Sequence, residues 1–233
     1  MKNNVKAIIS EALGRGRTTL SEYESKKILA EYGVQTVQEI LAQDLDEVLS
    51  AAHLIGYPIV LKFCSDKVTH KTEKGLIEIG LRNDAELQTA VSGMLERVGD
   101  LEGNFLVQQM VKGARELVIG MVRDQQFGPC VMFGLGGIFT EILNDVSFRV
   151  APIEKKDALE MMRDIRGHAI LDEVRGMEAA DLQLLSDSLI ALSNIGLEVK
   201  EIKEIDVNPL IIQGNRPICV DALIILEDSV NSN

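Results

Sequence analysis

The sequence has few cysteines, and their placement argues against two common uses of this residue. The 233 residues include three cysteines, Cys64, Cys130 and Cys219, an odd number that are far apart and form no C-x-x-C pattern. Disulfide scaffolds and structural zinc sites need cysteines in suitably spaced sets. The cysteine content therefore indicates a reducing compartment, and we expect a cytoplasmic protein.

The sequence is also short of positive charge and has no long hydrophobic run. Lysine and arginine number 24 against 36 acidic residues, which gives a formal net charge of -12 at pH 7. No segment reaches the length of a membrane span, and the amino terminus lacks the apolar run of a signal peptide. We therefore expect neither nucleic acid nor a membrane as a partner. An anionic ligand must be held by a local arrangement of lysine, arginine, backbone N–H groups and metal.

The order of predicted helices and strands indicates an α+β protein with two lobes. Hydrophobic residues make up 46% of the chain and charged residues 26%, which is typical of a soluble globular protein. We find no internal repeat and no low-complexity linker, and the best boundary is a bend near residue 110. We expect an amino-terminal helical extension over residues 1–19, a first lobe over 20–109 and a second lobe over 110–233.

Local signals place the elements within these lobes. Ser21 and Glu24 form a capping box, which begins a helix that ends at Gly33. Capping signals and apolar periodicity predict further helices, and alternating or continuous apolar runs predict strands. The predicted helices span 44–56, 83–97, 154–164 and 178–195, and the predicted strands 58–63, 76–81, 105–110, 116–122, 130–133, 201–206 and 217–226.

A glycine loop in the second lobe is a candidate phosphate site. The run FGLGGIFTE over residues 133–141 is followed by Asp145 and Arg149. Closely spaced glycines let backbone N–H groups approach an oxyanion that a Cβ would hold away. With the acid and the arginine, the pattern favours phosphate bound together with a metal. The alternative is that the glycines serve only a tight turn.

Lys62 is a lysine within an otherwise apolar strand. A buried ammonium without a partner is costly, so Lys62 should meet a carboxylate or an anionic ligand. A nucleotide phosphate would satisfy it. The alternative is an internal ion pair with Glu78 on the next predicted strand.

The polar segment over residues 65–75 is too long for a hairpin turn, and such loops are often functional. It contains His70, one of three histidines in the chain. An imidazole there can act as base, ligand or nucleophile. The alternative is a solvated loop histidine.

Asp206, Asn208 and Asp221 form a candidate oxygen site near the carboxyl end. Asp206 and Asn208 should project to the same side of one strand, because strand side chains alternate. Asp221 on a following strand would complete the set. Hard oxygen ligands of this kind suit Mg²⁺ that bridges nucleotide phosphates. The alternative is that Asn208-Pro209 simply ends the strand in a turn.

Taken together, this order of features resembles the ATP-grasp fold, in which two α+β lobes clasp a nucleotide. More narrowly, it resembles the small β subunit of NDP-forming acyl-CoA synthetases, the ADP-forming acetate–CoA ligases, which are relatives of succinyl-CoA synthetase. The resemblance extends from about Leu20 to Leu226. Its most distinctive pieces are residues 127–139 and 145–152.

The resemblance implies a phosphate relay through histidines. In this family a CoA-binding α subunit makes an acyl phosphate, whose phosphate passes through an α-subunit histidine to a histidine on a mobile loop of the β subunit. His70 falls at that second position. The implied function is the nucleotide-binding subunit of an ADP-forming synthetase that catalyses acyl-CoA + phosphate + ADP = acid + CoA + ATP. The implied partner is the α subunit, in an α2β2 assembly.

The resemblance also implies roles for the other site residues. Lys62 matches the lysine that contacts nucleotide phosphates, and Asn208 with Asp221 match the Mg²⁺ ligands, which Asp206 adjoins. Mg²⁺ is therefore the implied metal, and ATP with ADP, or GTP with GDP, is the implied nucleotide pair. The remaining implied nucleotide contacts come from the hinge between lobes, the next strand, the glycine loop and an arginine: Gln108, Gln109, Met110, Val111, Glu116, Gly134, Gly136, Gly137 and Arg149.

Two other functions are compatible with the same residues. A stand-alone ATP-grasp ligase would make an acyl phosphate for attack by an amine or a thiol, and His70 would then be dispensable. A non-catalytic nucleotide sensor or scaffold would bind ATP without forming a phosphoenzyme.

Overall fold

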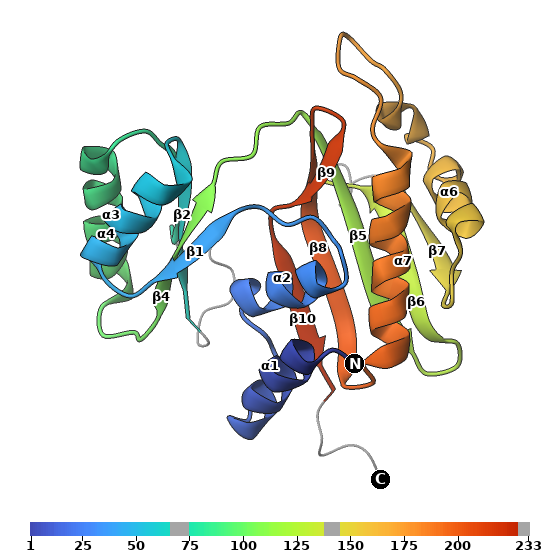
Figure 1. The fold of residues 1–233 in the computed structure, drawn as a ribbon, viewed down its shortest axis with the longest axis horizontal. Coiled ribbons are helices and arrows are strands. Elements are labelled where there is room, and N and C mark those ends of the chain that lie inside the picture. Colours follow the sequence, from blue (N-terminus) through green and yellow to red (C-terminus); the bar gives the residue numbers. More distant parts are fainter. Residues whose placement is uncertain (66–74, 138–144, 228–233) are drawn as a thin grey trace. The chain divides into compact units, whose positions relative to one another are not determined.

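The computed structural model describes residues 1–65, 75–137 and 145–227 of the chain (Figure 1). They belong to two compact units, Val37–Val111 and a second unit formed by Met1–Thr36 with Lys112–Asn233. Both units combine helices with an antiparallel sheet. Within the described ranges, no helix is both long enough and apolar enough to cross a membrane.

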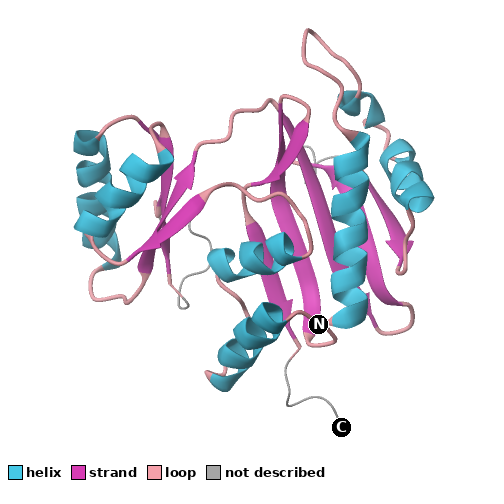
Figure 2. Ribbon diagram, in the orientation of Figure 1, coloured by secondary structure: helices cyan, strands magenta, loops and turns pink. Residues whose placement is uncertain are grey.

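The unit Val37–Val111 is a four-stranded sheet covered by two helices on one face (Figure 2). Both helices begin at a side-chain cap, in which Asp44 accepts from the N–H of Glu47 and Asn83 from that of Glu86. The helices are α3 (Leu45–Ile55) and α4 (Asp84–Val98). The strands, in spatial order, are β1 (Glu39–Ala42), β4 (Asn104–Gln109), β2 (Ile59–Cys64) and β3 (Ile77–Leu81).

The other unit is a six-stranded sheet with its helices on one side, where α2, α6 and α7 lie together (Figure 1). Apolar residues of these helices and of the sheet form one continuous core. The helices are α1 (Asn3–Gly14), α2 (Glu22–Glu31), α6 (Lys155–Asp164), the 3-10 helix η1 (His168–Leu171) and α7 (Leu182–Glu198). The strands run in the order β10 (Ala222–Leu226), β8 (Ile202–Gln213), β5 (Arg115–Asp124), β6 (Gly128–Leu135) and β7 (Val146–Val150), and β9 (Arg216–Cys219) also pairs with β8.

The start of the chain packs with its end, which differs from the predicted grouping of residues 20–36 with the first lobe. The N–H of Leu20 donates to Ile224 O at 3.0 Å, and the N–H of Cys219 donates to Gln35 O at 2.8 Å. The apolar stripe of α2, which includes Ile28 and Leu29, lies in the same core as β8 and β10. Local sequence signals carry no information about such distant pairing.

Two strands differ from expectation at the carboxyl end. The predicted strand over 217–226 is divided into β9 and β10, with Val220 and Asp221 between them. β8 continues past Pro209 to Gln213, so the interpretation of Asn208-Pro209 as the end of the strand is wrong. The break lies opposite Pro209, which has no N–H to contribute to the ladder.

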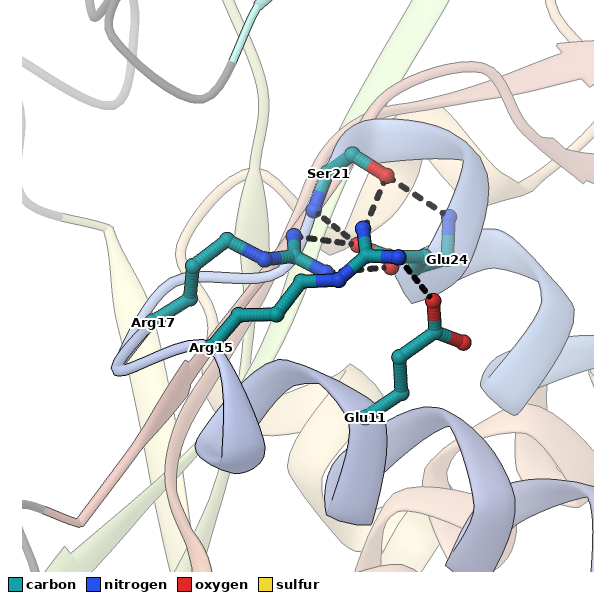
Figure 3. A network of polar contacts seen from close by, with 5 residues as sticks. All are labelled: Glu11, Arg15, Arg17, Ser21 and Glu24. Carbon is teal, nitrogen blue, oxygen red and sulfur yellow. Dashed lines mark hydrogen bonds and ion pairs between the residues drawn. The ribbon is translucent and has the colours of Figure 1, made fainter.

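A polar network joins the α1–α2 connection to the first turn of α2 (Figure 3). The Arg17 guanidinium donates to both carboxylate oxygens of Glu24, at 2.8 and 2.9 Å. The N–H and hydroxyl of Ser21 also donate to Glu24, each at 2.8 Å, and the N–H of Glu24 donates to Ser21 Oγ at 3.3 Å, which completes the predicted capping box. Burial raises the pKa of Glu24, but the hydrogen bonds from Arg17 and Ser21 outweigh it and lower the pKa below its usual value.

We predict that Glu24→Gln lowers the free energy of unfolding by about 1–2 kcal/mol at pH 7, because charge-assisted hydrogen bonds to a half-buried carboxylate are lost. A lowered folded-state pKa contributes stability that is present above the unfolded value of about 4.3 and is lost as the pH falls through the folded pKa. Denaturant titrations at pH 7 and at about pH 3.5 should therefore show the difference between wild type and variant shrinking. Glu11→Gln, which removes the exposed partner of Arg15, is the control and should change little. An equal loss at both pH values would contradict this account.

Candidate functional site

Polar side chains of β8 lie on the far face of the six-stranded sheet, by which we mean the side turned away from its helices. Ile205 and Val207 are buried in the core, on the helix side. Because side chains alternate along a strand, Asp206 and Asn208 point to the far face, as does Glu204. The predicted projection of Asp206 and Asn208 to one side is confirmed.

Asp221 lies beside Asn208 on this face. The N–H of Asn208 donates to Asp221 O at 3.2 Å, and the next pair along the ladder is Val207 opposite Ala222. Directly opposed residues of antiparallel strands have Cβ atoms about 4.5–5.5 Å apart and share a face. The structure therefore brings the three predicted metal ligands Asp206, Asn208 and Asp221 together.

These residues create an excess of negative charge. Burial raises the pKa of Asp206 to about 6, and repulsion from Glu204 and then Asp221 adds to the effect. A hard divalent cation would relieve this repulsion, and carboxylate with amide oxygens is a donor set that fits Mg²⁺. Within the described ranges, no three His, Cys, Asp or Glu side chains are placed to hold a metal ion by themselves. The set therefore suits a cation that also takes oxygens from a bound ligand or water.

The start of the glycine loop lies against Glu116. The N–H of Gly136 donates to Glu116 O at 2.8 Å, and a Cβ on Gly136 would lie 2.8 Å from the carbonyl carbon of Glu116. Gly137 has φ +64°, and a Cβ there would lie 2.8 Å from Glu116 Oε2. The N–H of Leu135 donates to Asp145 O at 3.4 Å.

Close packing of the protein itself thus explains part of the glycine pattern. A Cβ on Gly134 would lie 2.6 Å from Val146 Cγ1, and the N–H of Gly136 is already used within the sheet. Backbone donors for a phosphate would have to come from beyond Gly136. Residues 138–144, which continue the loop, lie outside the described residues. The assignment of Gly134, Gly136 and Gly137 to nucleotide binding stays a prediction.

Arg149 points to the helix side of the sheet. It stands opposite Val131, which is buried in the core, and its guanidinium forms an ion pair with Asp164 at 2.6 Å. Asp206 and Asn208 lie on the other face. The structure therefore does not bring Arg149 together with the candidate metal ligands.

In the unit Val37–Val111, Lys62 lies on the side of the sheet turned away from α3 and α4. Its neighbours Leu61 and Phe63 belong to the core under the helices, and Lys62 itself is only 4% exposed. Glu78 stands opposite Leu61, on the helix side, and its carboxylate lies 3.5 Å from Arg97. The alternative of a Lys62–Glu78 pair is therefore wrong.

The predicted hinge residues begin at the end of β4, the strand that pairs with the strand of Lys62. Gln108 is fully buried opposite Val60, on the same face as Lys62. Gln109 is exposed at the end of β4, and Met110 and Val111 are half-buried. The structure therefore places Gln108 and Lys62 on one face, as a shared ligand would require.

His70 lies among residues 66–74, which are outside the described residues. The residues that border this segment are anchored to its own unit. Ser65 Oγ donates to Glu102 O at 2.6 Å, and Arg97 donates to Gly75 O at 2.7 Å. The catalytic assignment of His70 stays a prediction.

Two residues on the strands that carry candidate site residues were missed. Glu204 continues the period-two pattern of Asp206 and Asn208, a signal that was present in the sequence. Arg115, which precedes Glu116, is 2% exposed and donates to backbone carbonyls, including those of Glu178 at 2.7 Å and Gly214 at 2.9 Å. These carbonyls lie 63 and 99 residues away, so no local signal identifies Arg115.

Comparison with known proteins gives consistent matches over almost the whole chain. The ATP-grasp domain family matches residues 11–226. The acetate–CoA ligase [ADP-forming] I subunit beta of Pyrococcus furiosus is 42% identical over 225 residues, which cover 94% of this chain and 96% of that protein. The predicted α+β, ATP-grasp fold is confirmed.

Solved structures of one archaeal enzyme are also similar. The dinucleotide forming acetyl-coenzyme A synthetase 1 of Ca. Korarchaeum cryptofilum, in complex with coenzyme A, Ca-AMPCP and HgCl+, has a TM-score of 0.91 and 39% identity, and covers 95% of this chain and 99% of that chain. A second structure of it, with Mg-AMPPCP and a phosphohistidine segment pointing towards the nucleotide binding site, has a TM-score of 0.86 and 38% identity, covering 96% of this chain and 100% of that one.

We predict that Asp206→Asn stabilises the metal-free protein at pH 7, because it removes a carboxylate that its neighbours repel. The expected gain in free energy of unfolding is on the order of 1 kcal/mol after allowance for solvent screening. A carboxyl with a raised folded-state pKa costs stability progressively as the pH rises from its unfolded value of about 3.9 to its folded value of about 6, so the gain should be smaller at pH 5 and should vanish only below about pH 4. Denaturant titrations with a chelator present measure this, with exposed Asp172→Asn as the control. Destabilisation at pH 7 would show that Asp206 is not under repulsion.

Proposed function

We propose that this chain, which belongs to the ATP-grasp family and within it to the β subunits of ADP-forming acetate–CoA ligases, binds the nucleotide and exchanges phosphate with it. The reaction is acyl-CoA + phosphate + ADP = acid + CoA + ATP. The observation that carries the proposal is that Asp206, Asn208 and Asp221 share one face of a sheet, in a chain of which 94% matches such a subunit.

Asn208 and Asp221, with Asp206 beside them, would hold Mg²⁺. When bound, the metal would neutralise charge on the nucleotide phosphates, which is the main requirement of phosphoryl transfer. The negative charge around Asp206 supports this assignment, because a bound cation would offset the repulsion of Asp206 by Glu204 and Asp221. In this proposal a bound metal ion lets a chain with a negative net charge hold an anionic nucleotide.

Lys62 would contact the phosphates and Gln108 to Val111 would bind the base. Lys62 is buried on the sheet face that is turned away from α3 and α4, and its ammonium suits an anionic ligand there. Gln108 offers an amide on the same face as Lys62. Glu116, Gly134, Gly136 and Gly137 would also contact the nucleotide.

His70 would carry the phosphoryl group between the partner subunit and the nucleotide. In the direction of ATP synthesis, the P–N bond of phosphohistidine breaks, and a terminal oxygen of ADP forms the new bond to phosphorus. The imidazole takes up one proton in this step, is released in its neutral form and can accept phosphate again. The finer parts of the proposal are a CoA-binding α subunit as the partner, an α2β2 assembly and a cytoplasmic location.

We predict that the full chain, incubated with Mg²⁺ and γ-labelled ATP, acquires acid-labile phosphate and that His70→Asn abolishes the label. His53→Asn and His168→Asn are matched controls and should label like wild type, because neither histidine lies in the predicted relay loop. Retention of the label by His70→Asn would exclude the relay. Turnover by the chain alone with His70→Asn would instead support a stand-alone ligase.

A further inference from the structure

We propose that Lys26 is a positioning residue for Asp221, which it orients by holding the preceding carbonyl from the helix side of the sheet. The inference rests on the proposed function, in which Asp221 is a metal ligand. It concerns a buried residue of α2. In this proposal Lys26 acts on the metal site through the backbone of Val220 and Asp221.

Lys26 is among the most deeply buried charged residues described. Its side chain is 1% exposed, and its ammonium lies 2.8 Å from Glu22 Oε1, one turn earlier in α2. The same ammonium donates to Val220 O at 3.1 Å. The peptide group between Val220 and Asp221 thus has its carbonyl held by a buried charge.

Both peptide groups that flank Asp221 are therefore held. Lys26 binds the carbonyl before it, and the N–H of Asn208 donates to the carbonyl of Asp221 itself, at 3.2 Å. These two peptide planes set the φ and ψ angles of Asp221 and hence the direction of its Cβ. Regular strand structure does not supply this constraint, because Asp221 lies in the break between β9 and β10.

α2 holds the segment after Asp221 as well. Ser25 is fully buried, and its hydroxyl accepts from the N–H of Ile224 at 3.1 Å. Leu20, just before the helix, donates its N–H to Ile224 O at 3.0 Å. The helix is therefore a fixed support against which the residues around Asp221 are aligned.

Stability alone does not account for a buried lysine and glutamate at these positions. Desolvation of two charges offsets most of their attraction, and well-packed apolar residues of similar size are often as stable or more so. An apolar pair could not donate to Val220 O. The ion pair keeps Lys26 charged and in place for that hydrogen bond.

The test is the affinity of the full chain for Mn²⁺ in the presence of the non-hydrolysable nucleotide AMPPCP, measured by electron paramagnetic resonance of free Mn²⁺. Lys26→Met should raise the dissociation constant of Mn²⁺ about tenfold. The double variant Glu22→Met/Lys26→Met removes both buried charges, should keep the melting temperature near that of wild type, and should show the same loss. It replaces Lys26→Met if the single variant fails to fold. Lys27→Met, at the exposed adjacent position, should stay within twofold of wild type.

A double-mutant cycle separates positioning from a general structural effect. Asp221→Asn alone should weaken Mn²⁺ binding, and adding Glu22→Met/Lys26→Met to it should cause less than a further twofold change. Two results would show that the positioning role is wrong while the metal assignment stands. In the first, Asp221→Asn weakens Mn²⁺ binding but Glu22→Met/Lys26→Met binds Mn²⁺ like wild type. In the second, the effects of the two changes on the dissociation constant multiply. If Asp221→Asn leaves Mn²⁺ binding unchanged, the metal assignment fails and the positioning role fails with it.

Discussion

The pairing register of β8 decides which side chains reach the candidate metal site. This strand pairs with β5 on one side and with β9 and β10 on the other, and its apolar residues Val207 and Leu210 are completely buried. A slip of one residue would bring Asp206 and Asn208 into the core and expose the apolar set, which the burial of charge and the loss of apolar contacts strongly oppose. The same hydrophobic packing that stabilises the sheet therefore places the metal ligands.

In both units the candidate ligand-binding groups occupy the sheet face turned away from the helices. Lys62 and Gln108 do so in one unit, and Asp206 and Asn208 in the other. Helices cover one face of each sheet and bury its apolar residues, so the opposite face remains for polar chemistry. Within the second unit, α2 supports Asp221 from the helix side of the sheet, because Lys26 and Ser25 hold backbone groups on either side of Asp221.

Alternation along strands was enough to predict that Asp206 and Asn208 share one side of β8, and the apolar run around Lys62 was enough to predict its buried environment. Alternation was not enough to predict which residues of neighbouring strands stand opposite each other. The suggested Lys62–Glu78 contact fails because Glu78 is aligned with Leu61, a register that depends on long-range pairing. Arg149 was grouped with the glycine loop by proximity in sequence, whereas the strand turns its side chain towards Asp164 in α6. The supporting role of Lys26 joins residues 194 positions apart, a distance over which local patterns carry no information.

The central claim is that Asn208 and Asp221 hold the metal that accompanies the nucleotide. Crystals of the chain with Mn²⁺ and AMPPCP, measured at a wavelength that gives a strong anomalous signal from manganese, test it directly. The account predicts an anomalous peak within coordination distance, roughly 2.0–2.3 Å, of a side-chain oxygen of Asn208 and one of Asp221. A peak bound only by other residues, with Asn208 and Asp221 turned away from it, would contradict the account.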